Sequence, residues 1–442
     1  MKQITIFLAA LLVLLSSCSE KDYLNAIPGE STALISFDVQ KLPLLRSVHG
    51  VDIQNKVYLF EAPDGNLGLC AAVSSQKEIT KWLEKLGKVG VCQPLEEYKD
   101  YHFTVFKGSW VVGYSDQALL MMGPVVGDAQ FELRRQMVKY LSQDEEKGIK
   151  GTPIFDKLDS IPSRIAMVAQ AQALPEKFVA PFMLGAPKDA DASQVLIAAE
   201  MSTKGGVLRI KGETFSFNRK VDAALKAAHQ VFRPISGHYG EVAKGAGLMA
   251  MQVNVNGQDF LPLIQQDKGL QALLAGINTA IDMDNIIRSV DGDMIITINA
   301  MDDEHLSMAM GAELSNYRFL EDVGYWKQSC PAGGRIVDWQ HGDMKLKDHK
   351  AYQYISGNTS FYFGVMPTNP ALFYSGTEAH KALQMLHIPA SGDFDPRVKG
   401  EKMVMTISLA GLSGDKQEAT TAITSMLKPL FGNISLIEYS LK

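Results

Sequence analysis

The sequence predicts an α+β protein of two tandem similar modules, each a mainly antiparallel sheet with helices packed on one face. Short strand-like segments follow one another through polar turns, and strands joined in this way pair antiparallel. Internal similarity suggests the two modules. TALISFDV at 32–39 is similar to AGLMAMQV at 246–253, and LPLL at 42–45 is similar to LPLI at 261–264. The order of the elements that follow also repeats.

Each half places a hairpin after this first strand. Residues 57–73 alternate as two strands around a Pro-Asp-Gly-Asn turn that contains Asp64. An Asp-Gly pair between apolar runs is typical of a tight hairpin turn. Residues 293–312 have a polar turn, 302–305, in the equivalent place.

A short helix follows each hairpin, at 76–86 and at 315–323, because apolar residues recur there at helical spacing. These residues are Ile79, Trp82, Leu83 and Leu86, and then Phe319, Leu320 and Val323. Each helix is expected to end at a glycine, Gly87 or Gly324, since glycine adopts the left-handed backbone that ends many helices.

Both halves then continue with two strands, a helix and a further strand. The expected ranges are 101–106, 110–114, 129–141 and 164–171, and then 351–355, 360–365, 377–386 and 402–410. The first half adds a hairpin of 195–201 and 206–217, and the second ends with a strand at 434–441. A helix at 219–232 joins the halves.

The expected domains follow from this order. Residues 1–17 are a lipoprotein signal peptide, 18–31 an anchor and tether, 32–232 the first α+β module and 233–442 the second. No Pro- or Ser-rich linker separates the modules, so they are expected to pack closely.

The start of the chain predicts export and a lipid anchor. Met1-Lys2-Gln3 is a minimal positive region, and the apolar run 4–15 is too short to cross ~30 Å of hydrocarbon. Leu15-Ser16-Ser17-Cys18 resembles a bacterial lipobox, in which the cysteine is acylated and becomes the first mature residue. Cys18 is therefore expected to anchor the protein to a membrane, with more than one acyl chain for stable residence. An ordinary signal peptide cut near Cys18 is the alternative.

The residues after Cys18 suggest an outer-membrane lipoprotein. Ser19 follows the cysteine, and by resemblance to enterobacterial sorting, aspartate there would retain the protein in the inner membrane. Residues 20–22 partly resemble the charged tetrads that send Bacteroidetes lipoproteins to the cell surface. The sequence is compatible with either side of the outer membrane, periplasmic or surface-facing.

Composition excludes several partners. The formal net charge is −6 without a basic stripe, so nucleic acid is not expected as a partner. No later stretch stays apolar for the about 18 residues of a membrane-spanning helix.

The three cysteines after Cys18 do not form a recognisable motif. Cys70, Cys92 and Cys330 have no CxxC or histidine-paired spacing, so neither a disulfide framework nor a zinc site is predicted. The 20 methionines, among them Met249, Met251, Met308 and Met310, are interpreted as gap-filling core residues.

Catalytic motifs are weak. Ser74 and Lys77 form a Ser-x-x-Lys, and residues 356–358 imitate Ser-x-Asn, but the Lys-Thr-Gly of serine acyl-transferases is missing. A capping box explains the first cluster without catalysis, with Ser75 accepting from the backbone of Glu78 and the Glu78 side chain reaching back. No dinucleotide, Walker or zinc-protease motif is present, so no cofactor is predicted.

Two clusters of acids and histidines are interpreted as solvated turns. They are Asp302, Asp303, Glu304 and His305, and then His341, Asp343, Asp348 and His349. Adjacent residues on a strand or turn point in different directions, whereas a metal needs ligands that converge. No metal site is predicted.

Aromatic residues crowd one region of the second half. They are Tyr352, Tyr354, Phe361, Tyr362, Phe363, Phe373 and Tyr374. Alternation places Phe361 and Phe363 in the core and leaves Tyr362 as the exposed candidate for stacking on a ligand. Trp110 is its counterpart in the first module, and the two rings would flank a groove between the modules. The alternative is that both rings pack under helices.

The stretch YLNAIPGESTALISFDVQKL at 23–42 resembles the start of a Bacteroidetes lipoprotein family, domain of unknown function 4836. Ala26-Ile27-Pro28 and residues 32–37 carry the resemblance. It implies an envelope location and the two-module layout, and it supplies no catalytic residues.

These observations predict a cell-envelope lipoprotein that binds an unknown protein or glycan ligand without catalysis. A hydrolase acting on envelope polymers or imported glycans is the alternative. The two differ in their pocket: a binding protein needs an apolar concavity with a few polar groups, whereas an enzyme needs titratable groups within hydrogen-bond reach.

Overall fold

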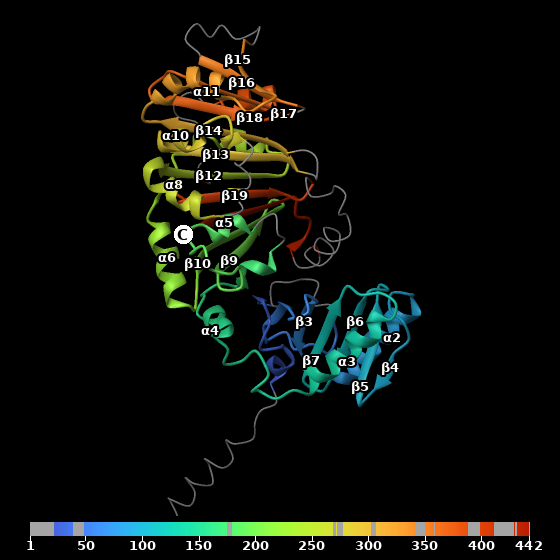
Figure 1. Ribbon diagram of the computed structural model, residues 1–442. Coiled ribbons are helices and arrows are strands. Elements are labelled where there is room, and N and C mark those ends of the chain that lie inside the picture. The colour runs from blue at the N-terminus through green and yellow to red at the C-terminus, as the bar shows by residue number, and fades with distance from the viewer. Residues whose placement is uncertain are drawn as a thin grey trace, which may run out of the picture. The chain divides into compact units, whose positions relative to one another are not determined.

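The computed structural model divides the chain into two compact units, Met1–Ser160 and Ile161–Lys442 (Figure 1). The described residues are 22–38, 48–174, 179–267, 271, 277–301, 306–340, 350–357, 359–387, 398–410, 428 and 431–441. Cys18 and the clusters at 302–305 and 341–349 lie outside them. Within the described part, no helix is long and apolar enough to cross a membrane.

The first unit contains an antiparallel sheet in the order β1-β2-β3-β7-β6-β5-β4. Its strands are β1 Ala33–Phe37, β2 Val57–Glu61, β3 Leu67–Ala72, β4 Glu96–Tyr98, β5 Tyr101–Phe106, β6 Trp110–Tyr114 and β7 Ala118–Gly123. Its helices are the 3-10 helix η1 Tyr23–Ala26, α2 Gln76–Lys88, α3 Ala129–Ser142 and α4 Pro153–Asp159. Helix α3 packs against β6 and β7.

Helix α2 begins where the sequence predicts it. Ser75 is the N-cap and its hydroxyl accepts a hydrogen bond from the backbone of Glu78 at 3.4 Å, which confirms this half of the capping box. The backbone N–H of Ser75 donates to the carbonyl oxygen of Gly50 at 3.1 Å. The predicted end at Gly87 is wrong, because the helix continues to Lys88. Gly90 has the positive φ, +73°, that glycine tolerates best at a helix end.

The second unit carries a larger sheet in the order β8-β9-β10-β20-β19-β12-β13-β14-β18-β17-β16-β15. All these pairs are antiparallel except β10–β20, which is parallel. The strands are β8 Ile165–Gln170, β9 Leu196–Lys204, β10 Val207–Phe215, β12 Met249–Asn256, β13 Val290–Met301, β14 Leu306–Leu314, β15 Gly334–Asp338, β16 Lys350–Ser356, β17 Thr359–Met366, β18 Ala371–Gly376, β19 Met403–Ser408 and β20 Leu436–Leu441. The short β11, Phe232–Arg233, also pairs with β12. The α+β class and the mainly antiparallel pairing are confirmed.

Helices cover both faces of this second sheet. They are η4 Ala171–Ala173, α5 Ala180–Met183, α6 Arg219–His229, α7 Gly240–Lys244, α8 Gly257–Gln266, α10 Met283–Arg288, η6 Arg318–Asp322, α11 Val323–Ser329 and α12 Ala379–Gln384. Helices α6, α8 and α10 share the main apolar core with one face, while α7 and α12 cover the other face around Ala250, Ile295 and Tyr374. The expectation of helices on one face is wrong here, because both alternating sets of strand residues are apolar and need cover. Gly324 lies inside α11, so its predicted role as a helix end is also wrong.

The division between the units differs from the expected boundary at 232/233. The hairpin β9–β10, expected in the first module, belongs to the second unit because β10 pairs with β20 at the end of the chain. One pairing order nevertheless occurs twice. Strands β1-β2-β3-β7-β6-β5-β4 pair in the same sequence as β12-β13-β14-β18-β17-β16-β15.

Candidate functional site

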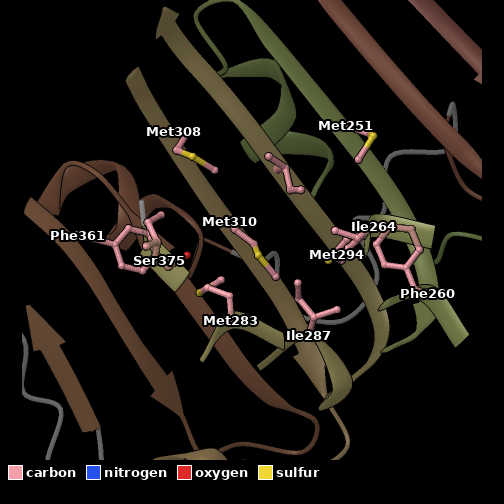
Figure 2. A pocket seen from close by; sticks show the side chains of 12 residues that line it. Met251, Phe260, Ile264, Met283, Ile287, Met294, Met308, Met310, Phe361 and Ser375 are labelled. Atoms are coloured by element: carbon pink, nitrogen blue, oxygen red, sulfur yellow. The ribbon is translucent and has the colours of Figure 1, made fainter. Parts of the chain in front are cut away.

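An apolar pocket lies on one face of the second sheet, where alternating residues of neighbouring strands project toward α8 and α10 (Figure 2). We call it the methionine pocket. Its lining residues are Met251, Phe260, Ile264, Ile277, Met283, Ile287, Met294, Ile296, Met308, Met310, Phe361 and Ser375. Its interior volume is about 40 Å³. Among these lining residues there is no titratable side chain, and Ser375 supplies a single hydroxyl.

Strand alternation explains why methionines meet in this pocket. Met308 and Met310 are two residues apart on β14, so their side chains leave the sheet on the same face. Met251 on β12 pairs with Ile296 on β13, and Met310 on β14 also pairs with Ile296. Neighbouring strands thus bring residues from distant parts of the sequence side by side.

The helices over the pocket are held by specific local contacts. Asn256 caps α8 by accepting from the backbone of Gln258 at 2.9 Å, and Asp282 caps α10 by accepting from Asn285 at 2.9 Å. Gly257 begins α8 so close to α10 that a Cβ atom there would lie 1.8 Å from the carbonyl oxygen of Ile287. Only glycine permits this approach, which sets the roof of the pocket.

A buried polar cluster lies on the opposite face of the same strands. Asp293, 1% exposed, accepts backbone hydrogen bonds from Ser236 at 2.9 Å and Gly237 at 2.9 Å. Asn254 donates from its side chain to Asp293 at 2.8 Å. Glu313 accepts from the backbone of Asp293 at 3.0 Å, and its other oxygen contacts His238 Nδ1.

The geometry assigns this cluster a structural role. The carboxylate of Asp293 is occupied by main-chain donors, so it holds the segment 236–238 on the sheet. Burial, together with the nearby Glu313 and Asp293, raises the pKa of the fully buried Tyr239. Within the described residues, no group of three or more His, Cys, Asp or Glu side chains is arranged to hold a metal ion.

Each unit also has a polar depression. One, in the first unit, has a volume of about 720 Å³. It is lined by Asp22, Tyr23, Leu24, Asp52, Gln54, Asn55, Lys56, Tyr58, Ala72, Val73, Asp116, Gln117 and Asp159. The other, in the second unit, has a volume of about 350 Å³. It is lined by Ser163, Glu200, Met201, Ser202, Arg209, Lys211, Glu401, Val404, Glu438 and Ser440.

The aromatic residues expected at a ligand site do not line these pockets. Trp110 is 8% exposed, so its expected exposure is wrong: every residue of β6 is buried. Tyr362 is half-buried, and its hydroxyl accepts from Gln353 at 3.1 Å while its ring lies 4.8 Å from that of Trp339. The expected inward direction of Phe361 and Phe363 is confirmed, since both are buried.

The serine motifs and the three cysteines are the remaining sequence candidates within the described residues. Ser74 and Ser356 belong to different compact units, and Ser75 is used as the helix cap. Cys70 and Cys92 are buried free thiols and Cys330 is a half-buried one. Burial raises the pKa of each of these thiols, which disfavours the reactive thiolate.

Sequence reasoning missed Ser375, Met283 and Met294 as pocket residues. The i, i+2 methionine pairs at 249/251 and 308/310 were a signal, but core packing explains such pairs equally well. Ser375 lies in β18, which the sequence analysis did not predict as a strand, and its place beside Met310 depends on the β14–β18 pairing.

The fold and the pocket define an α+β protein with an apolar, methionine-lined interior site. The chain belongs to the family described as domain of unknown function DUF4836, whose model matches residues 23–383. No curated protein matches the chain. Among solved structures, crystal form IV of TP0453 matches at 11% identity with a TM-score of 0.28, covering 42% of this chain and 77% of that one. Crystal form III of TP0453 matches at 9% identity with a TM-score of 0.25, covering 82% and 96%.

Proposed function

We propose that this protein is a non-catalytic binding protein of the cell envelope and that it takes an apolar ligand into the methionine pocket. One observation carries the proposal: the described lining consists of apolar side chains and one hydroxyl, with no acid, base or thiol. Such a lining can hold hydrocarbon but has no group to transfer a proton or attack a bond.

The pocket is small, but the methionine side chains that line it can repack to admit a ligand. An interior of about 40 Å³ accommodates little more than one methyl group as it stands. Five of the lining residues are methionines, whose unbranched side chains have three rotatable bonds and repack easily. A ligand can therefore enter by displacing thioether side chains without moving the sheet.

Binding of N-phenyl-1-naphthylamine, followed by its fluorescence, tests the proposal. Ile296 is a half-buried lining residue, so Ile296→Trp would occupy the space of the pocket and weaken binding at least about tenfold, or ~1.4 kcal/mol. Ile437→Trp is the matched control, because Ile437 is also half-buried against the same core but does not line the pocket. Absence of binding to the wild type, or equal loss in both variants, would contradict the proposal.

A hydrolase is the alternative function, and the depression of about 350 Å³ in the second unit favours it. Three glutamates, Lys211 and three serines line that depression. However, Lys211 Nζ lies 2.6 Å from Glu401 and Arg209 Nε lies 3.2 Å from Glu438, so both cations are already held in ion pairs with carboxylates of the same depression. If the purified wild type released products from envelope polymers, the hydrolase would be favoured over the binding protein.

A glycan ligand would fit a different surface. The depression of the first unit combines side-chain amides, carboxylates and two tyrosines, and such groups hydrogen-bond to the hydroxyls of a sugar. The methionine pocket lacks these groups. Binding assays therefore distinguish the two sites: an apolar compound is expected to bind the methionine pocket of the second unit, and a sugar the depression of the first unit.

We also propose that Cys18 is lipidated and that the protein resides in the outer membrane. The apolar run 4–15 and the Leu-Ser-Ser-Cys sequence support this. Metabolic palmitate labelling is expected to mark the wild type and to be absent from Cys18→Ala, with loss of the variant from the membrane fraction. Equal labelling of both proteins, or labelling of neither, would contradict the anchor.

We further infer that the two modules are related by duplication. The short sequence matches and the repeated pairing order of seven strands support this inference. The repeat would run from β1 to β7 and from β12 to β18. Comparison of the two halves across family members would oppose a duplication if they aligned no better than shuffled sequences.

A further inference from the structure

We propose that the polar depression of the second unit is a binding site for a small zwitterion, a molecule such as a short peptide with one ammonium and one carboxylate group. This site is additional to the methionine pocket and does not depend on the proposed function. Its place on the sheet, the charges of its lining and the surroundings of Arg209 support the inference.

The depression lies on the face of the second sheet opposite to the main apolar core. Arg209 and Lys211 are two residues apart on β10, so their side chains leave the sheet on one face. Glu438 lines the depression from β20, whereas the next residue, Tyr439, belongs to the apolar core that contains Met251 of the methionine pocket. The two sites are therefore separate. A volume of about 350 Å³ is within the range of small-molecule sites, ~300–1,000 Å³.

Strand pairing brings opposite charges side by side in this depression. The antiparallel register of β9 and β10 places Glu200 opposite Lys211, and the parallel register of β10 and β20 places Glu438 opposite Arg209. Neighbouring strands are ~4.8 Å apart, so each cation has a carboxylate on the adjacent strand. Glu401, which precedes β19, adds a third carboxylate 2.6 Å from Lys211 Nζ.

Arg209 has hydrogen-bonding capacity that the described residues do not use. Its Nε lies 3.2 Å from Oε1 of Glu438, which is an ion-pair distance. The same Nε is nevertheless buried and, within the described part of the chain, has no hydrogen-bond partner. A buried N–H without an acceptor is unfavourable, and a guanidinium binds a carboxylate through two parallel hydrogen bonds. The side chain is 36% exposed and lines the depression, so a carboxylate of a ligand can reach it and supply an acceptor.

The charges of the lining favour an ammonium group on the same ligand. Three glutamates and two cations line the depression, which gives a net charge of −1. A ligand with a carboxylate alone would bring a further negative charge next to these glutamates, and like charges at such distances repel. A ligand with an ammonium group alone would leave Arg209 without its acceptor. A zwitterion meets both requirements.

Isothermal titration calorimetry of the purified protein at pH 7 with dialanine, N-acetyl-dialanine and dialanine amide tests this. The second compound lacks the ammonium group and the third lacks the carboxylate. Dialanine is expected to bind the wild type at least about tenfold more tightly than either analogue, because a hydrogen bond to a charged group is lost with each.

Variants of Arg209 test its part in the site. Arg209→Gln should weaken dialanine about tenfold, to the affinity of dialanine amide, because both then lack the contact between carboxylate and guanidinium. Arg209→Lys keeps the charge without the planar fork and should retain part of the difference between the two compounds. Arg335→Gln is the matched control, since Arg335 is an exposed arginine on β15 of the same sheet and does not line the depression. It should bind dialanine as the wild type does.

Equal affinities of the wild type for dialanine and its two analogues, no binding of any of them, or tighter binding of maltose than of dialanine would overturn the inference. An Arg209→Gln variant that still prefers dialanine over its amide would overturn the role of Arg209. Far-ultraviolet circular dichroism establishes that the variants are folded, and the comparison of the three compounds on the wild type needs no variant. The dye assay for the methionine pocket is a separate measurement, so failure of one site is distinguishable from failure of the other.

Discussion

Asp293→Ala is expected to lower the free energy of unfolding of the second unit by about 3–5 kcal/mol. The carboxylate of Asp293 accepts from the backbone of Ser236 and Gly237 and from the side chain of Asn254. Alanine would leave these donors buried without an acceptor. It would also leave a void beside Glu313 and His238, where the carboxylate of Asp293 stood.

Asp291→Ala is the matched control for this measurement. Asp291 lies two residues away on β13 and pairs with Arg233 at 2.8 Å, but its side chain is 41% exposed. Exposed ion pairs contribute about 0–1 kcal/mol, so this change should be small. Urea unfolding gives the two free energies, and hydrogen exchange at 236–238 shows whether the freed amides open. Equal losses in both variants would contradict the assigned role of Asp293.

The sequence predicted those helices and strands whose boundaries are set by residues nearby in the chain. The strands at 101–106 and 110–114 are found as predicted, and the turn between them contains Gly108, whose φ is +76°. Helix α2 begins directly after its predicted N-cap, Ser75, whose hydroxyl accepts from the backbone of Glu78. Its end was missed because two glycines, Gly87 and Gly90, both permit a helix to stop, and the backbone adopts positive φ at the second.

Long-range pairing explains the larger differences. The run Val207–Phe215 has the alternation of a strand wherever it lies, but its partner β20 is more than 200 residues further along the chain. No local pattern reveals that partner, so the sequence predicts the hairpin β9–β10 in the first module, whereas the hairpin lies in the second compact unit. The same limit applies to helices on both faces of the second sheet, which depend on how α7 and α12 return to it.

The sequence predicted the shared face of two methionines of the pocket but not the pocket itself. Alternation at Met308 and Met310 indicates that both side chains point to one face, and their burial agrees with the core interpretation. Ser375 is 65 residues from Met310 in sequence but pairs with it across β14–β18. A single serine in an apolar strand has no local signature of a pocket residue. Its place in the pocket depends on the register of a strand that the sequence analysis missed.

Met310→Ala is expected to destabilise the second unit by about 2–5 kcal/mol and, in return, to create a site for benzene. Met310 is 5% exposed and lines the pocket, so its removal enlarges the existing space of about 40 Å³ instead of opening an isolated gap. Apolar cavities of sufficient size stay dry and accept small apolar molecules. Benzene bound to the folded variant would raise its melting temperature by mass action.

Met405→Ala separates a ligand pocket from an ordinary core position. Met405 is 1% exposed in the same apolar core but does not line the pocket. Both variants should melt at lower temperature, because both lose buried hydrocarbon. Only Met310→Ala should regain several degrees of melting temperature in saturated benzene. If Met405→Ala responds equally, or if neither responds, the methionines at β14 are core filling, and the pocket does not expand around a ligand in the way that the proposed function requires.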